Sequence, residues 1–182
     1  MDIKEKISGL ETKKVLIVDP SEENFFAAKE YLEGVGLRVD YASDSKKAIE
    51  MIQGDQFSNN GDWYQFVFSD YKLETLEGAE ITKKALENSV RPVIITEKDS
   101  PLRNYENNTS EILILPYGKI LQGKKNDPMI WERTLQMTLD YFLNRLNQRY
   151  FNSVSLSHQF SARNSSHFLE RTLDRYKDIS SP

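Results

Sequence analysis

Two carboxylates and one hydroxyl stand at the ends of three apolar runs in this chain. Asp19 and Asp70 each close such a run, and Thr96 closes another. Two carboxylates at neighbouring strand ends would hold a hard cation such as Mg²⁺ through oxygen ligands and water. The cation could offset the charge of an incoming phosphoryl group, a carboxylate could be its nucleophile, and Thr96 could hydrogen-bond a phosphoryl oxygen. The plainer alternative is that both acids merely end their strands at the solvent.

Continuous apolar runs are typical of strands that are buried on both faces of a parallel sheet. Five strands are predicted: Val15–Asp19, Leu37–Ala42, Phe66–Asp70, Pro92–Thr96 and Ile112–Leu115. The segments between and after them are a helix capped by Ser21 and ended by Gly34 and Gly36, a helix capped by Ser43 or Asp44, Glu77–Asn88, a short polar segment at 100–108, and a long helix, Pro128–Tyr150. This alternation indicates a doubly wound α/β sheet with right-handed crossovers. Its functional crevice should lie at the carboxyl ends of the strands.

Composition excludes several classes of protein. The chain has 182 residues and no cysteine, which excludes a disulfide scaffold and thiolate metal sites and suits a reducing cytoplasm. No apolar run is long enough for a membrane span and Met1–Lys14 is charged, so a cytoplasmic protein without a membrane partner is expected. The net charge of −4 argues against wholesale nucleic-acid binding. Because the negative charge lies in residues 1–127 and residues 128–182 are slightly basic, two parts are indicated.

The segment from Lys14 to Ile120 resembles the receiver domain of bacterial two-component response regulators. Its first run resembles the family's first strand with an acidic end, and Phe66–Asp70 resembles the phosphoacceptor strand. Leu76–Ile81 is similar to the glycine-led third helix, and Pro92–Thr96 to the fourth strand with its switch hydroxyl. The resemblance implies a flavodoxin-like five-stranded parallel sheet of order 2-1-3-4-5, with an extended last helix and a helical C-terminal tail.

The resemblance also implies roles for single residues. Asp70 would accept a phosphoryl group from a sensor kinase, and Thr96 would be the switch hydroxyl. Asp19, Asp70 and the backbone carbonyl of Lys72 would hold Mg²⁺. The chain would then be a signalling switch that acts through protein partners, not an enzyme, and no flavin or nucleotide is expected. An enzyme on this fold, such as a flavin or phosphatase protein, is disfavoured because no phosphate-cradling loop follows the first strand.

Three residues depart from the family pattern. Pro20 replaces a second acid that would be the more direct metal ligand, so Mg²⁺ binding should be weakened. Glu97 replaces a small residue and adds negative charge beside the phosphoryl site. Leu115 stands where the family has a lysine before Pro116, and leucine cannot make that lysine's charge-assisted bonds to phosphate.

The lost lysine leaves two outcomes open. Lys98 or Lys119 could reach the site from other positions, whereas Lys124–Lys125 is interpreted as a solvated loop. The chain is then either a working or sluggish phosphoacceptor, or a degenerate receiver that binds partners without phosphate.

The sequence divides into an N-terminal extension at 1–12, a receiver-like domain at 13–150 and a serine-rich tail at 151–182. The tail distantly resembles a Fis-type helix-turn-helix, with His167–Lys177 as recognition helix and Arg163, Arg171 and Arg175 as DNA contacts. This gives an alternative function as a DNA-binding transcription regulator. The other interpretation of the tail is a loosely ordered segment ending in one amphipathic helix.

The helix predicted over Pro128–Tyr150 is longer than a receiver's last helix needs. Its apolar positions share one stripe: Leu135, Leu139, Phe142, Leu143, Leu146 and Tyr150. The end from Leu143 to Phe151 would expose that stripe beyond the sheet, and a second copy of the chain could cover it. A homodimer is therefore expected.

Overall fold

The computed structural model describes residues 2–55, 63–76, 80–96, 113–116 and 124–144. The chain divides into two compact units, Met1–Leu139 and Asp140–Pro182. The first unit holds the sheet and the candidate site. Of the second unit, residues 140–144 are described, and they are helical. The predicted helix-turn-helix and the far end of the predicted dimer stripe lie outside the described residues.

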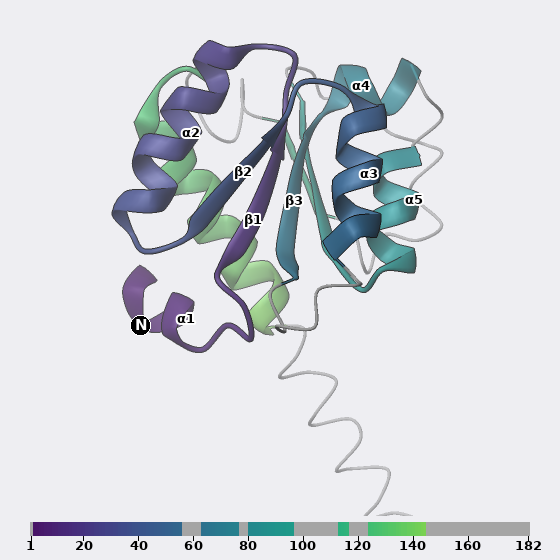
Figure 1. The fold of residues 1–182 in the computed structure, drawn as a ribbon. Coiled ribbons are helices and arrows are strands. Elements are labelled where there is room, and N and C mark those ends of the chain that lie inside the picture. Colours follow the sequence, from purple (N-terminus) through teal and green to yellow (C-terminus); the bar gives the residue numbers. More distant parts are fainter. Residues whose placement is uncertain (1, 56–62, 77–79, 97–112, 117–123, 145–182) are drawn as a thin grey trace, which may run out of the picture. The chain divides into compact units, whose positions relative to one another are not determined.

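Five parallel strands form one sheet in the first unit (Figure 1). They are β1 (Lys14–Val18), β2 (Arg38–Ala42), β3 (Tyr64–Asp70), β4 (Arg91–Thr96) and β5 (Leu113–Pro116). Their order across the sheet is β2-β1-β3-β4-β5, which confirms the predicted doubly wound topology. Strand β3 is central, between β1 and β4, and all the pairings are parallel.

Helices cover both faces of this sheet (Figure 1). The helices of the described residues include α1 (Ile3–Ser8), α2 (Glu22–Gly34), α3 (Ser45–Asp55), α4 (Tyr71–Leu76) and α5 (Glu80–Glu87). Residues 128–144 are also helical, and we call the part within the first unit, residues 128–139, the Trp131 helix. Helices α3 and α5 cover one face, and α2 and the Trp131 helix cover the other.

The core explains why the strands read as unbroken apolar runs. On one face, Leu16 and Val67 pack with Ile52 of α3 and Ile81 of α5 in a single buried cluster. On the other face, the rings of Phe68 and Trp131 form a T-shaped pair with a centroid distance of 5.9 Å. A strand between two such layers has no solvent-facing side, so alternating polar residues would be buried without partners.

Local signals set the ends of the helices beside the site. The Ser21 hydroxyl accepts a hydrogen bond from the Asn24 amide at 3.5 Å and caps α2, as predicted. The Asp44 carboxylate accepts one from the Lys47 amide at 2.9 Å, so Asp44 caps α3. After α2, Gly36 has a φ of 96°, a conformation that favours glycine.

Two short helices were not predicted. Helix α1 lies in the stretch expected to be an extension, and it begins with a reciprocal capping box between Asp2 and Glu5. Helix α4 follows β3 without a break. Each has six residues, too few to show a helical apolar period. Across the described ranges, no helix combines the length and apolar character that crossing a bilayer requires.

Candidate functional site

Asp19 lies directly after β1, at the carboxyl edge of the sheet. Its carboxylate is buried, with the residue 4% exposed. Oδ1 accepts hydrogen bonds from the backbone amide of Ser21 at 2.9 Å and from Nδ2 of Asn24 at 3.0 Å. Both donors come from the start of α2, so the β1–α2 connection folds around this carboxylate and fixes its orientation.

Asp70 is the last residue of β3, the central strand. Its side chain is 11% exposed, against 5% for that of Asp19. Oδ1 accepts a hydrogen bond from the backbone amide of Lys72 at 2.6 Å, within the first turn of α4. The two carboxylates therefore come from adjacent strands and meet at one edge, as the sequence predicts.

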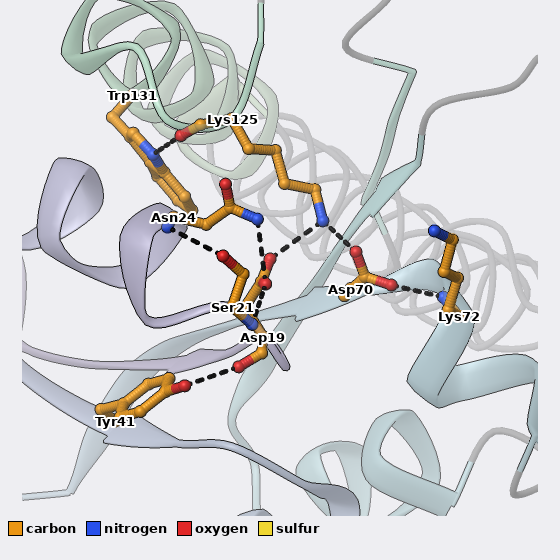
Figure 2. Close-up of polar contacts among 8 residues, drawn as sticks. All are labelled: Asp19, Ser21, Asn24, Tyr41, Asp70, Lys72, Lys125 and Trp131. Atoms are coloured by element: carbon orange, nitrogen blue, oxygen red, sulfur yellow. Dashed lines mark hydrogen bonds and ion pairs between the residues drawn. The ribbon is translucent and has the colours of Figure 1, made fainter.

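The ammonium group of Lys125 lies between the two carboxylates (Figure 2). Its Nζ atom donates to Oδ2 of Asp19 at 2.9 Å and also forms an ion pair with Oδ2 of Asp70. The Lys125 side chain is only 5% exposed. The prediction that Lys125 belongs to a solvated loop was therefore wrong, because two buried acids need a counter-charge and this ammonium supplies it.

The backbone around Lys125 is held by contacts with two helices. Nε1 of Trp131 donates to the backbone oxygen of Lys125 at 2.9 Å, and Trp131 is itself buried (Figure 2). Nδ2 of Asn126 donates to Oε1 of Glu23, in the first turn of α2, at 2.7 Å. The Asp127 carboxylate accepts from the Met129 amide at 2.9 Å where the Trp131 helix begins. These contacts hold the segment that carries Lys125 beside the carboxyl edge of the sheet.

Tyr41 supports the site from β2. Its hydroxyl donates to the backbone oxygen of Asp19 at 2.9 Å, and its ring stacks on Phe25 at 4.3 Å between centroids. Burial raises the pKa of the Tyr41 phenol above its ordinary value, and the negative charges of Glu22, Asp19 and Asp44 raise it further. The phenol therefore stays protonated and remains a hydrogen-bond donor.

The other predicted site residues fall into place along the strands. Thr96 is buried at the end of β4, one residue beyond Ile95, the partner of Asp70 across the β3–β4 pair. Leu115 is buried in β5 opposite Ile95, so the position expected to hold a lysine is part of the core. Pro20 is exposed.

Several predicted residues lie outside the described part of the chain. They are Glu97, Lys98, Lys119, Arg163, Arg171 and Arg175. Their predicted roles, including DNA contact by the tail, stay predictions. The metal roles assigned to Asp19, Asp70 and the Lys72 carbonyl also stay predictions; the backbone amide of Lys72 donates a hydrogen bond to Asp70.

A topological signal could have pointed to Lys125. In a parallel sheet with right-handed crossovers, the connection that leaves each strand begins at the carboxyl edge. Every lysine between Leu115 and the helix that starts at Pro128 was therefore a candidate counter-charge. The position directly before Pro116 is therefore not the only one from which a lysine of this chain can reach the carboxylates.

The chain was compared with protein families, curated proteins and solved structures. No protein-family model matches the chain. No curated protein matches its sequence. Solved structures do match.

One is the phosphorylated cyanobacterial phytochrome response regulator RcpA, with a TM-score of 0.53 and 12% identity over 72% of this chain and 94% of that one. Another is the chemotaxis protein CheY4 of Vibrio cholerae, with a TM-score of 0.51 and 20% identity over 69% of this chain and 98% of that one. A CheY-like receiver domain protein of Methanospirillum hungatei has a TM-score of 0.50 and 19% identity over 71% of this chain and 94% of that one.

At sequence identities of 12–20%, these matches carry information on the fold alone. The three matches cover nearly the whole of each receiver structure. The sheet of this chain, with Asp19 and Asp70 at its carboxyl edge, has the fold of response-regulator receiver domains.

Proposed function

We propose that this chain is a receiver-type signalling module that accepts a phosphoryl group on Asp70 and acts through protein partners. The observation that carries the proposal is the buried ammonium of Lys125 on the Asp70 carboxylate. A receiver site needs a fixed cation beside its acceptor, since charge-assisted hydrogen bonds to phosphate are the strong ones. The family position for that cation holds Leu115 here, and Lys125 restores the charge from another part of the chain.

The reaction is the transfer of a phosphoryl group from a donor to a carboxylate oxygen. A carboxylate oxygen of Asp70 forms a bond to phosphorus, and the bond from phosphorus to the donor's leaving group breaks, with the electron pair going to that group. The product is an acyl phosphate on Asp70. Lys125 would then pair with a phosphoryl oxygen, while the hydroxyl of Thr96, at the end of the neighbouring strand, is the second proposed donor.

The proposed switch follows from the same ion pairs. The Asp19–Lys125–Asp70 triad is made when Asp70 is a free carboxylate. Adding a phosphoryl group lengthens the acceptor and increases its negative charge, so the ammonium must move or share its bonds. Because the Lys125 segment is tied to α2 and to the Trp131 helix, that movement would alter a surface that a protein partner can read.

The test is an intact-mass measurement after incubation with acetyl phosphate. We expect the wild type to gain the mass of one phosphoryl group and Asp70→Asn to gain none. Asp44→Asn, which changes an exposed carboxylate at the start of α3, is the matched control and should behave as the wild type does. A wild-type protein that is folded by circular dichroism yet takes no adduct would contradict the proposal.

A further inference from the structure

A receiver fold implies a Mg²⁺ ion at the carboxylates, and the donor set around Asp19 and Asp70 can be tested for it. Mg²⁺ requires near-octahedral oxygen ligation, and it is usually bound through one or two carboxylates and several waters. Oδ1 of Asp19 already accepts two hydrogen bonds and Oδ2 accepts one from Lys125. Oδ1 of Asp70 accepts one from the Lys72 amide and Oδ2 one from Lys125.

Every oxygen of the two carboxylates thus has a donor from the chain itself. The residue after Asp19, where a further acid would add a ligand, is Pro20. In the ranges that the structure describes, no group of three or more acidic, histidine or cysteine side chains could hold a metal ion. The residues as arranged do not fit a Mg²⁺ site, because the ion would have to displace Lys125 from both carboxylates.

Lys125 has the properties of a replacement for the ion. Its ammonium bridges the two acids whose oxygens would otherwise be the metal ligands, and its side chain is buried to the same extent as that of Asp19, with 5% of each exposed. Two carboxylates that contact one ammonium lie close together, and burying both as anions is costly without a cation between them. The ammonium meets that need with one charge, fixed to the chain and independent of the ion concentration in solution.

We propose that Lys125 is the resident cation of this site and that it takes the place of a divalent metal ion. Two consequences follow. The first is that the wild-type site has little affinity for Mg²⁺ or Mn²⁺, whereas removal of the ammonium charge turns Asp19 and Asp70 into a divalent-cation site. The second, which rests on the proposed function, is that phosphoryl transfer to Asp70 does not depend on a divalent ion.

Metal binding tests the first consequence without reference to phosphorylation. Mn²⁺ is titrated into the wild type, Lys125→Gln and Lys124→Gln by calorimetry. Glutamine keeps a hydrogen-bond donor but removes the charge, and Lys124 is the exposed neighbour that serves as matched control. We expect Lys125→Gln to bind Mn²⁺ at least tenfold more tightly than the wild type and Lys124→Gln to equal the wild type.

Thermal unfolding gives a second readout for a destabilised variant. A ligand that binds only the folded state raises the unfolding midpoint. Mn²⁺ should therefore raise the midpoint of Lys125→Gln and leave that of the wild type unchanged. Equal Mn²⁺ affinity in the wild type and Lys125→Gln, or equal shifts of their midpoints, would overturn the proposal.

Phosphorylation in EDTA tests the second consequence. Wild-type protein is incubated with acetyl phosphate in EDTA and, separately, in Mg²⁺, and the adduct is measured by mass. We expect yields within about twofold of each other. An adduct formed only with Mg²⁺ would overturn the proposal. No adduct in either buffer would contradict the proposed function instead, and the Mn²⁺ titration would then decide the role of Lys125 alone.

Discussion

Nε1 of Trp131 donates a hydrogen bond to the backbone oxygen of Lys125 at 2.9 Å, and the same indole forms a T-shaped pair with the ring of Phe68. One buried side chain therefore connects the cation of the candidate site with the centre of the sheet. The contact explains how a lysine that belongs to no strand can be held in place between two acids.

Trp131→Phe should lower the free energy of unfolding by about 1–3 kcal/mol, because it leaves the Lys125 carbonyl without its donor in a buried position. Urea unfolding measures the change. Trp63→Phe is the control, since Trp63 is 40% exposed and its replacement should change stability by no more than about 0.5 kcal/mol. Equal losses in the two variants would contradict a special role for the Trp131 hydrogen bond.

Lys125→Met should destabilise the fold by about 3–5 kcal/mol, because it leaves two buried carboxylates without their shared cation. Adding Asp70→Asn to it should cost less than the sum of the two single changes, since the double variant no longer buries a pair of like charges. A double-mutant cycle by urea unfolding tests this. Strict additivity of the two losses would show that Lys125 and Asp70 do not interact.

We expect the raised pKa of Tyr41 to make the fold less stable in alkali. Its folded-state pKa is raised above 10.0, chiefly by burial. The protonated phenol therefore makes its full contribution to the free energy of unfolding at pH values below 10.0. This contribution is lost as the pH rises through the folded-state pKa, because the unfolded chain loses its proton at a lower pH than the folded chain does. Tyr41→Phe should be less stable than the wild type at neutral pH by about 1 kcal/mol, because it lacks the hydrogen bond to Asp19. As the pH is raised, its free energy of unfolding should fall less than that of the wild type, and urea unfolding at several pH values measures both. Equal alkaline slopes for the two proteins would refute this account.

We expect the lowered pKa of Asp44 to cause a smaller loss of stability in acid. The hydrogen bond from the Lys47 amide, and then that from the Ser43 hydroxyl, lowers the pKa of the Asp44 carboxyl below 3.8. Its contribution is present above that value and is lost as the pH falls through the folded-state pKa. Asp44→Ala removes the cap of α3 and should cost about 1 kcal/mol at neutral pH. As the pH is lowered, the thermal unfolding midpoints of the wild type and Asp44→Ala should converge. A difference between the midpoints that stays constant would contradict the role given to the Asp44 carboxylate.

Pro20→Asp tests whether an added acidic ligand lets the site bind a divalent ion while Lys125 is still present. An added acid beside Asp19 should do little alone while Lys125 remains between the carboxylates. Combined with Lys125→Gln, it should tighten Mn²⁺ binding by about a further tenfold, which is about 1.4 kcal/mol. Calorimetry measures both. A large gain from Pro20→Asp alone would mean that a divalent ion can bind without displacing Lys125.

The strands and the two acids were predictable because burial on both faces imposes a pattern that a sequence shows directly. Val15–Val18 and Phe66–Phe68 are unbroken apolar runs, and the acid that ends each run must lie at the carboxyl edge. The Asp2 and Glu5 spacing of the α1 capping box is likewise visible in the sequence.

Lys125 was not predictable in the same way. Its place depends on a hydrogen bond from Trp131 and on the link between Asn126 and Glu23, which joins residues 103 positions apart. Neither contact leaves a local pattern, and a lysine in the polar run before Pro128 has the composition of any exposed loop. Tertiary contacts decide which lysine of such a run turns inward.

Surface connections between secondary-structure elements ordinarily tolerate insertions and deletions. The stretch from Lys125 to Trp131 should be an exception, because the buried indole holds the backbone from which the ammonium extends. One residue added or removed there would change the registry between that indole and a cation that must reach two acids. The spacing of Lys125 and Trp131, rather than the identity of any residue at the end of β5, is then the feature by which natural or designed variants keep or lose the site.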